Sequence, residues 1–298
     1  MTKTSKSPVR VAREALAVGA RVLRRYAHRN SPRRFTQPQL FACLVLKTFF
    51  KTDYRGIAQL LVDLTELRTT LGLESVPHFT TLHTASRRLL RLPRANRLLT
   101  AIVRRALGRR RTIALAAFDS TGLDCGHISS YYVKRRSRVP SVWQTTTYTG
   151  FAKLEAAVDC ASHLIIAAIP RRGPRVDVDR FVPLLEAALR RVKLGSVLAD
   201  AGFDSEANHR HARERRGVKS FIPAKIGRPT DKPPTGRHRR RMKQRLSKTY
   251  GRYGQRSQAE TMISMVKRRL GAAVAGRSYW SQCRDLMLLT ITYDLMLL

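Results

Sequence analysis

The sequence predicts an α/β protein in which a small helical domain precedes a domain with a mixed central sheet flanked by helices. Three observations lead to this fold class. Apolar residues recur at helical spacing before residue 108, and short continuous apolar runs typical of buried strands follow residue 109. In addition, 298 residues with 43% hydrophobic content are enough for one or two domains with a sizeable core. We place the domains at residues 1–108 and 109–298.

The charge balance indicates the class of binding partner. The chain has 58 Lys and Arg residues against 20 Asp and Glu residues, a formal net charge of +38 at pH 7. A positive field of this size attracts polyanions, so nucleic acid is the expected partner and a membrane surface is the weaker alternative. No apolar run reaches the length of a membrane span, and the longest, residues 40–50, is interrupted by Lys47. We therefore expect no membrane association.

The location expected from the sequence is the cytosol. No uninterrupted apolar segment follows the basic N-terminus, so a signal peptide is not expected. The four cysteines are scattered without a CxxC pair, so the sequence suggests neither a zinc knuckle nor a disulfide scaffold, and we expect buried, reduced thiols.

The first domain is predicted to be a bundle of helices. The predicted helices lie within residues 1–34, 37–50, 54–64 and 80–92, the last with Thr80 as its N-cap. Five arginines lie close together at the end of this region: Arg87, Arg88, Arg91, Arg94 and Arg97. They favour a helix-turn-helix that binds DNA ends, and a purely architectural role is the alternative.

The second domain is predicted to open with three strands, of which the last two are antiparallel. The first covers Thr112–Phe118 and ends in Asp119, and the next two follow at residues 153–158 and 163–169, after a Thr-rich stretch at 144–148. The remaining elements are a helix at 178–192, a strand at 196–199 that ends in Asp200, a helix at 204–216 and a strand at 218–222.

This order of strands and helices is that of a ribonuclease H-like domain. In such a domain, acids at the C-terminal ends of two neighbouring strands converge with a third acid from a later helix. Asp119, Asp200 and Glu260 meet that requirement. The individual alternatives are local: Asp119 caps the following turn, Asp200 starts the turn at Gly202, and Glu260 belongs to a solvated helix face.

Other acids are assigned local roles. We predict that Asp204 caps the helix that follows it. We interpret Asp124, Asp177 and Asp179 as loop or cap residues.

A helix predicted over residues 252–267 carries four polar residues on a narrow edge. At about 100° per residue, Tyr253, Arg256, Glu260 and Lys267 fall within one arc of about 60° beside an apolar face. A carboxylate flanked by two cations and a phenol suits a site that holds a divalent metal and binds phosphates. The C-terminal stretch, residues 282–298, is predicted to be a helix that covers the core.

The segment before this helix, residues 225–250, is predicted to be a loop because of its Gly and Pro content. It contains the basic block of Arg239, Arg240 and Arg241, which we expect to order on a phosphate backbone. A solvated basic segment without specific contacts is the alternative.

With these residues in place, the chain resembles the DDE transposases of bacterial insertion sequences, in the group of families four and five. The resemblance runs from about residue 37 to the end. It rests on Phe118-Asp119-Ser120-Thr121-Gly122, Leu198-Ala199-Asp200-Ala201-Gly202-Phe203-Asp204, and the signature Tyr-x2-Arg-x3-Glu-x6-Lys at Tyr253, Arg256, Glu260 and Lys267. Residues 56–61 and 76–82 also resemble the N-terminal region of such enzymes. The 60-residue gap from Asp200 to Glu260 favours the compact subgroup without a large β insertion.

The resemblance implies DNA transposition, with metal-dependent cleavage at the element's ends and strand transfer into target DNA. It implies two Mg²⁺ ions, for which Mn²⁺ can substitute, held by Asp119, Asp200 and Glu260. Tyr253, Arg256 and Lys267 would bind phosphates near the scissile bond. The implied partners are the terminal inverted repeats, target DNA and a second copy of the chain, because two ends must be paired.

Two other functions remain open at the level of sequence. One is a catalytically inactive, DNA-binding regulatory relative of a transposase. The other is a tyrosine recombinase, because His238-Arg239-Arg240-Arg241 imitates a His-x-x-Arg box and Tyr250 or Tyr253 follows it. The strand-rich centre disfavours the recombinase.

Overall fold

The computed structural model describes residues 4–30, 32–109, 111–125, 151–173, 176–224, 233–245 and 250–298. The Thr-rich stretch at 144–148 and part of the predicted loop lie outside these ranges. The helices and turns are α1 (Pro8–Val22), α2 (Gln37–Phe49), α3 (Tyr54–Asp63), α4 (Thr65–Thr70), α5 (Phe79–Leu89), α6 (Leu92–Leu107), η1 (Val178–Arg180), α8 (Phe181–Leu189), η2 (Ala201–Phe203), α9 (Glu206–Arg210), η3 (His211–Arg215), α10 (Arg237–Arg245), α11 (Tyr250–Gly254), α12 (Ser257–Leu270) and α13 (Tyr279–Leu297). The strands are β1 (Thr112–Cys125), β2 (Phe151–Asp159), β3 (Ile165–Arg172), β4 (Lys193–Ala199), β5 (Lys219–Phe221) and β6 (Ala273–Val274).

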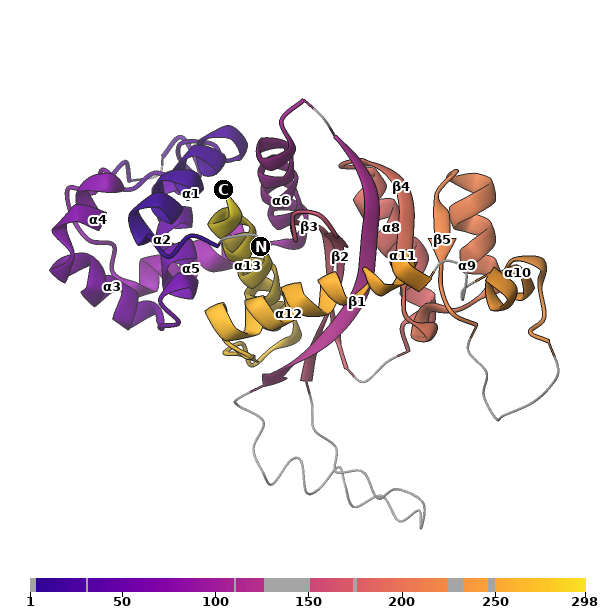
Figure 1. Cartoon of the computed structure of the whole chain (residues 1–298). Helices are drawn as coiled ribbons and strands as arrows, with labels where there is room; N and C mark the ends of the chain where they lie inside the picture. The colour runs from indigo at the N-terminus through magenta and orange to yellow at the C-terminus, as the bar shows by residue number, and fades with distance from the viewer. Residues whose placement is uncertain are drawn as a thin grey trace, which may run out of the picture.

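The fold is mixed α/β, with a central mixed sheet flanked by helices, as the sequence predicts. The N-terminal helices lie at one end of the molecule, the sheet lies in the middle, and α9 and α10 lie at the other end (Figure 1). The strand order is β3-β2-β1-β4-β5, and β6 pairs with the end of β1. The three strands β3, β2 and β1 are antiparallel, whereas β1, β4 and β5 are parallel.

The N-terminal helices agree with the prediction in most places and differ in three. The helix predicted at 80–92 is α5, and His78 rather than Thr80 precedes its first turn. This helix ends at Leu89, and a separate helix, α6, begins at Leu92 with a proline in its first turn, where a missing N–H costs nothing. The short helix α4 was not predicted. Each of these boundaries depends on local turns that apolar periodicity does not reveal.

Two strands differ from their predicted form. β1 continues past Asp119 to Cys125, because its second half pairs with β2 and β6 after the pairing with β4 has ended. Asp124 therefore lies in a strand and not in a loop. β2 is buried along nearly its whole length instead of alternating between core and solvent, because helices cover both faces of the sheet.

Opposite faces of the sheet carry different helices. The ring of Phe118 in β1 packs on Phe181 in α8, with ring centroids 5.5 Å apart. Successive side chains of a strand point to opposite faces, so Asp119 points away from α8. On that second face α12 packs on β1 and β2, and Figure 1 shows α12 in front of the sheet and α8 behind it.

The C-terminal helix α13 is buried over most of its length and joins the two parts of the molecule. It packs on α6 and α2 of the N-terminal helices and also on β3. Its buried Asp294 accepts a hydrogen bond from the Ile165 N–H at 3.0 Å, and burial raises the pKa of this carboxyl well above its usual value. The prediction that this segment is a helix covering the core is confirmed.

A second link between the two parts is the buried guanidinium of Arg191, which follows α8. It donates to Asn96 Oδ1 (2.7 Å) and Thr100 Oγ1 (2.9 Å) of α6 and to the carbonyl oxygen of Ile166 (3.2 Å). Burial lowers its pKa to about 10. The N-terminal helices are thus fastened to the sheet by buried polar contacts as well as by apolar packing.

The prediction of a loop over residues 225–250 is wrong for residues 237–245, which form α10, whereas the described residues 233–236 are irregular as predicted. This basic helix packs on α9 through the buried Met242. Three acids contact this helix. Glu206 in α9 accepts the backbone N–H groups of His238 and Arg239, and Glu214 and Asp204 bond the side chains of the same two residues. Within the described ranges, none of the helices is long and apolar enough to cross a membrane.

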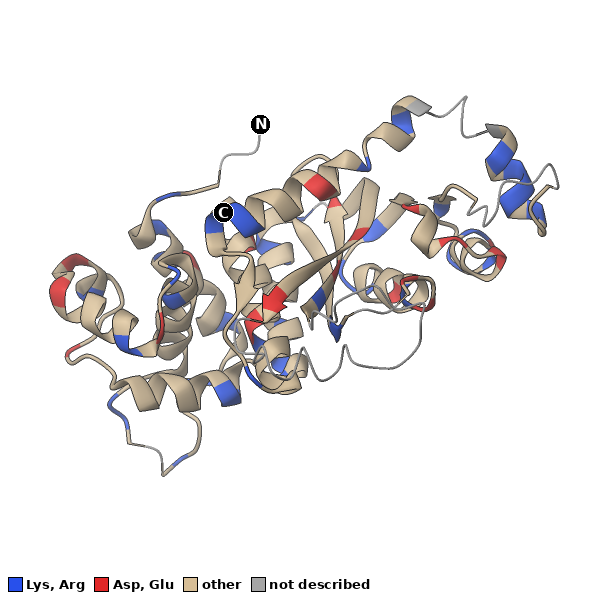
Figure 2. Ribbon diagram, turned by 90° about the horizontal axis from the view of Figure 1, so that it is seen from below, with Lys and Arg blue, Asp and Glu red and all other residues tan. Residues whose placement is uncertain are grey.

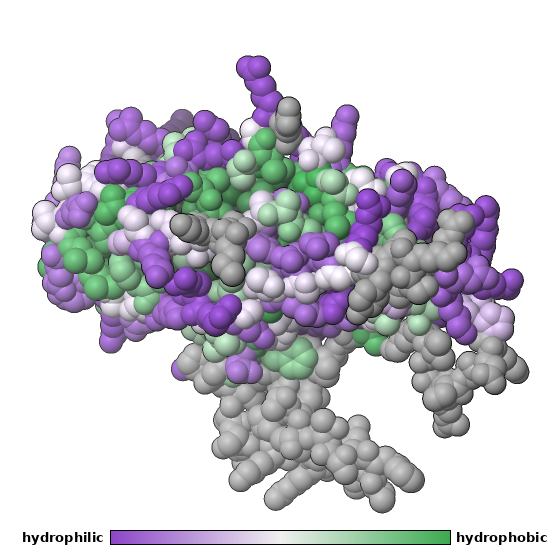
Figure 3. Space-filling view, in the orientation of Figure 1, coloured by the Kyte–Doolittle hydropathy of each residue, from purple (hydrophilic) through white to green (hydrophobic). Residues whose placement is uncertain are grey.

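Figures 2 and 3 show how charge and polarity are distributed. Lys and Arg positions occur in the N-terminal helices, around the sheet and densely along α10 (Figure 2). On the face drawn in Figure 3, hydrophilic residues predominate at the right end and are mixed with hydrophobic residues at the left end. The positive charge seen in the sequence is therefore spread over the surface and is not confined to one domain.

Candidate active site

Asp119 and Asp200 lie side by side at the end of the parallel pairing between β1 and β4. The last backbone pair joins Phe118 to Ala199. Asp119 follows Phe118 within β1, and Asp200 directly follows Ala199, the last residue of β4. Both are half-buried. The sequence prediction that two strand-end carboxylates lie together agrees with this register, although β1 itself continues further.

Each aspartate also makes the local contact expected from its alternative role. Asp119 Oδ1 accepts the N–H of Ser120 at 2.8 Å, and Asp200 Oδ1 accepts the N–H of Gly202 at 3.0 Å. These bonds use one oxygen of each carboxylate and orient the group. A local turn contact and a ligand role are therefore compatible in the same side chain.

The electrostatic environment of Asp119 is unusual for an aspartate. Burial raises its pKa to about 6; the Ser120 N–H and Arg256 oppose the rise, and the negative charges of Asp200 and Glu260 add to it. The four ionisable side chains therefore lie within electrostatic range of one another. A group of carboxylates that repel each other in a partly buried place is stabilised by a bound cation.

The helix predicted from Arg252 to Lys267 is interrupted. α11 ends at Gly254 and α12 begins at Ser257, so Arg256 lies in the turn that starts α12. Tyr253 nevertheless reaches the same place, because its hydroxyl donates to the Ala199 carbonyl oxygen at 3.4 Å, next to Asp200. Burial raises the pKa of Tyr253, and the charge of Asp200 contributes to the rise.

Glu260 lies on the first turn of α12 and forms an ion pair with Arg256. The Glu260 side chain is 53% exposed and that of Arg256 is 24% exposed. Lys267 lies on the same helix, about 10 Å further along the axis by helical rise. The structure therefore brings together Asp119, Asp200, Tyr253, Arg256 and Glu260, and it places Lys267 two turns away.

The three arginines of the basic block lie on α10 and differ in their contacts. The Arg239 guanidinium donates to the buried carboxylate of Asp204, with an Nη2–Oδ2 distance of 2.7 Å. Asp204 is therefore an ion-pair partner and not the helix cap that the sequence predicts; that cap is Ser205. Arg240 and Arg241 are exposed on the outer side of α10.

A buried polar network supports β1 on the face opposite Asp119, and sequence reasoning missed it. The Ser120 hydroxyl donates to Asp177 at 3.0 Å, and Asp177 also pairs with Lys153. Next to it, Arg171 bonds Glu155 at 2.8 Å and Asp179 at 3.3 Å. Asp177 and Asp179 are thus network members. The signal in the sequence that could have revealed this network is the pair of charged residues Lys153 and Glu155, two positions apart within the buried run of β2.

The residues present fit a divalent metal in kind, and the two aspartates are neighbours at one end of the parallel pairing. Their carboxylate oxygens are the hard donors that Mg²⁺ and Mn²⁺ prefer, and like charges gather at one end of the sheet. In the part of the chain that the structure describes, however, no three His, Cys, Asp or Glu side chains are close enough together to enclose an ion. Asp119 and Asp200 would hold a metal with Glu260 only after Glu260 leaves Arg256.

The chain is similar to a family of known proteins over most of its length after the N-terminal helices. A family model described as "Transposase DDE domain" matches residues 110–295, more than half of the chain and all three acids. Among solved structures, the chain is similar to one described as "Crystal structure of a pre-cleavage Mos1 transpososome", with 13% identity over 91% of this chain and 80% of that chain. The TM-score of that comparison is 0.22, so it carries no argument about this chain.

Proposed function

The chain belongs to the transposase DDE domain family, and from this premise we propose that it cleaves DNA at the ends of a bacterial insertion sequence and joins them to target DNA. The observation that carries the proposal is the register of β1 and β4, which puts Asp119 beside Asp200. The order of the sheet, with two antiparallel strands on one side of β1 and parallel β4 and β5 on the other, supports a ribonuclease H-like catalytic domain.

We assign Asp119 and Asp200 as metal ligands and Glu260 as the third. Two Mg²⁺ ions, or Mn²⁺ in their place, would polarise the attacking oxygen and stabilise the leaving oxygen of an in-line displacement at phosphorus. The protein residues hold the carboxylates in place: Ser120 and Gly202 orient one oxygen of each aspartate. The attacking group is water or a DNA 3′-hydroxyl, so no covalent protein intermediate is required.

We assign the cationic side chains of the signature to binding of the DNA substrate. Arg256 has a planar guanidinium suited to a phosphate and lies beside the carboxylates, while Tyr253 packs against the end of β4. When Glu260 turns to a metal, Arg256 becomes free for a phosphate next to the scissile bond. Lys267, together with Arg240 and Arg241, would bind phosphates further along the DNA.

The partners follow from the reaction. We propose that the N-terminal helical region, residues 1–108, binds the terminal inverted repeats, that target DNA is the second substrate, and that a homodimer forms on the DNA because two ends are joined. A cytoplasmic, nucleoid-associated location follows from this substrate.

The strongest alternative is a catalytically inactive, DNA-binding regulatory relative, since an ion-paired Glu260 is also compatible with a protein that binds without cutting. The tyrosine recombinase receives no support from the site. The imitated His-x-x-Arg box lies in α10, where His238 Nε2 bonds Glu214 at 2.8 Å and Arg239 bonds Asp204. These two side chains are thus engaged with acids of the protein.

The proposal is tested with supercoiled plasmid carrying the element's own flanking repeats, in Mg²⁺ or Mn²⁺. We expect the wild type to cut at the repeat boundary and Asp119→Asn to bind the repeats without cutting. Lys193→Gln, at the other end of β4, is the matched control and should cut normally. If both wild type and Asp119→Asn bind and neither cuts in any metal, the regulatory alternative replaces the transposase.

A further inference from the structure

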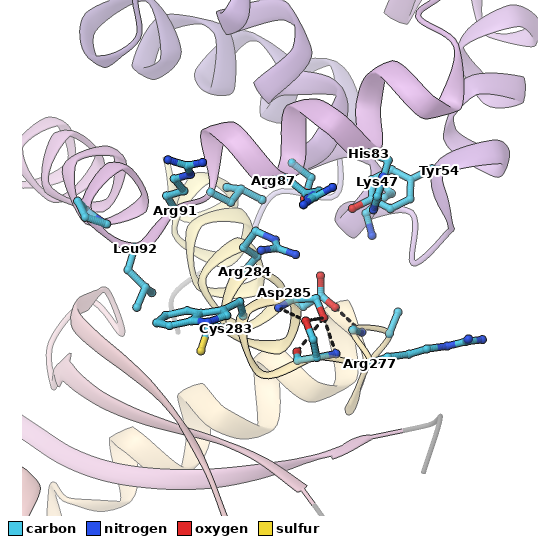
Figure 4. Close-up of a pocket in the computed structure, with 18 residues that line it drawn as sticks. Lys47, Tyr54, His83, Arg87, Arg91, Leu92, Arg277, Cys283, Arg284 and Asp285 are labelled. Carbon is cyan, nitrogen blue, oxygen red and sulfur yellow. Dashed lines mark hydrogen bonds between the residues drawn. The ribbon is translucent and has the colours of Figure 1, made fainter. Parts of the chain in front are cut away.

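A groove of about 1110 Å³ lies away from the carboxylates, between the N-terminal helices and the segment that joins β6 to α13 (Figure 4). One wall is formed by α2, α3, α5 and the start of α6, and the other by residues 275–285. The groove lies beyond the C-terminal end of α12, whereas Glu260 lies near its start. By helical rise the two places are about 15 Å or more apart.

The groove is strongly cationic. Its lining includes five cations and a single carboxylate; the cations are Lys47, Arg87, Arg91, Arg277 and Arg284. Figure 4 shows Arg87, Arg91 and Arg284 on the two sides of one space. No ion pair joins any of the four arginines to an acid among the residues that the structure describes. Their charges are therefore available to an anionic ligand.

The single carboxylate, Asp285, also lines the groove and lies within electrostatic range of Lys47 and Arg284. Its Oδ2 accepts the N–H of Gly276 at 2.8 Å, so it fastens the loop that precedes α13. The loop is also tightly packed, because a Cβ on Gly276 would come within 2.6 Å of the Ser281 backbone. Ser278 then caps α13 with a capping box. These contacts hold this wall of the groove rigid.

An aromatic side chain stands on this rigid wall. Trp280 lines the groove on the first turn of α13 and is 61% exposed, one of few large apolar side chains left open to solvent in the described ranges. It lies against Tyr279, with ring centroids 5.1 Å apart. An exposed indole beside several unpaired cations is suited to a ligand with both aromatic rings and negative charges.

We propose that this groove binds an unpaired segment of DNA, with a base stacked on Trp280 and the neighbouring phosphates on Arg87 and Arg284. The inference rests on the proposed function for the identity of the polyanion, since a reaction that cuts strands releases unpaired ends. Duplex DNA is the poorer occupant, because its bases are already stacked on one another and its convex surface does not enter a concave groove. The groove is thus a second DNA site, separate from the carboxylates.

The test uses the full-length chain and an oligothymidylate of about twelve nucleotides, within the range of single-strand site sizes. The sequence has two tryptophans, so Trp143→Phe leaves Trp280 as the only indole. We expect the oligonucleotide to quench Trp280 fluorescence in the absence of any metal. A hairpin duplex with the same number of nucleotides should bind the protein but quench far less.

Substitutions then locate the binding. We expect Trp280→Ala to raise the Kd for the oligonucleotide about tenfold, because the stacking of one base is lost. The double variant Arg87→Ala with Arg284→Ala should raise the Kd by about the same factor, because two phosphate contacts are lost. The matched controls are Val176→Ala, another exposed apolar residue, and Arg210→Ala with Arg215→Ala, two exposed cations at the α9 end. These should leave the Kd within twofold.

Three outcomes would overturn the proposal: an unchanged Trp280 spectrum at saturation, equal losses in the control variants, or equal quenching by the duplex. Because every readout is binding without metal, a failure of plasmid cleavage alone does not affect it. Conversely, a loss of the groove site would leave the assignment of Asp119, Asp200 and Glu260 as it stands.

Discussion

The guanidinium of Arg256 forms an ion pair with the carboxylate of Glu260, which lies one helical turn later. The pair joins the two functions proposed for this site, because Glu260 is assigned as a metal ligand and Arg256 as a phosphate-binding residue. In this structure each neutralises the other. Binding of metal and DNA would separate them, so the pair is expected to oppose metal binding in the absence of DNA.

Replacing Arg256 should therefore strengthen metal binding while weakening catalysis. In Arg256→Gln, Glu260 is released and the positive charge near Asp119 is removed. We expect Mn²⁺ to bind a few-fold more tightly, since an exposed pair of this kind contributes at most about 1 kcal/mol. Mn²⁺ titration followed by electron paramagnetic resonance measures the change.

The control for this variant is Arg269→Gln, which removes the same charge from the exposed far end of α12. It should leave Mn²⁺ affinity unchanged. An Arg256→Gln protein with wild-type or weaker Mn²⁺ affinity would show that the ion pair does not compete with metal.

The raised pKa of Asp119 predicts how stability depends on pH. Folding raises this pKa from 3.8 to about 6, so the folded protein binds the proton more tightly than the unfolded chain does. The charged carboxylate therefore costs stability above pH 6, the cost diminishes as the pH falls, and it is absent below about pH 4. Asp119→Asn should be the more stable protein at pH 7, by up to about 3 kcal/mol, with the difference lost near pH 4.

Urea unfolding of the metal-free proteins between pH 4 and pH 7.5 tests this prediction. Asp124→Asn, an exposed aspartate in the same strand, is the control and should show no comparable trend. A difference between wild type and Asp119→Asn that does not vary with pH would contradict the assigned pKa.

Mn²⁺ should reverse this order of stability. Because metal and proton compete for the same carboxylate, Mn²⁺ is expected to stabilise the wild type at pH 7 and to lose affinity roughly tenfold for each pH unit below about 6. Asp119→Asn should gain no stability from Mn²⁺. Melting temperatures with and without the ion measure both effects, and an equal Mn²⁺ shift in the variant would exclude Asp119 as a ligand.

The Arg239–Asp204 pair should decide whether α10 stays on α9. The Asp204 carboxylate is fully buried, so Arg239→Ala leaves a buried charge without its main partner, at a cost of about 3 kcal/mol. We expect faster amide hydrogen exchange throughout α10. Arg240→Ala, on the exposed side of the same helix, should change neither exchange nor stability, and slow exchange in Arg239→Ala would refute the role of the pair.

Arg240 and Arg241 should contribute to DNA affinity through phosphates alone. We expect the affinity of the wild type to fall steeply as salt rises, and each Ala substitution to reduce the slope of log K against log salt by about one. The loss should be the same for any DNA sequence. Lys193→Gln is the charge-matched control, and a slope unchanged from wild type in both arginine variants would remove α10 from the DNA-binding surface.

Local patterns in the sequence were enough to predict the core of the sheet and the two aspartates. The apolar run before Asp119 and the one before Asp200 are buried strands because each is short, continuous and bounded by polar residues. Acids that directly follow two such strands become neighbours as soon as the strands pair in parallel. The helices α2, α3, α8 and α13 were predictable for the same kind of reason, since each buries an apolar face.

Contacts between distant segments decided what local patterns missed. The angular argument for Arg252–Lys267 assumed one straight helix, and the turn between Gly254 and Ser257 breaks it. Its polar residues still gather at the carboxylates, because Tyr253 is held by the end of β4. The helix α10 formed where composition predicted a loop, and it is contacted by acids that lie 24 to 35 residues earlier in the chain.

The sequence by itself determined the sign of the charge, most of the strands and helices around the sheet, and the position of Asp119 and Asp200 directly after apolar strand segments, because these depend on composition and on periods of two to four residues. Only the tertiary structure decided that Tyr253 reaches the end of β4, that Arg239 is engaged with Asp204, and that Trp280 lines a cationic groove. Those relationships depend on how separate segments pack. Packing is set by the shape and burial of the whole core, which no local period records.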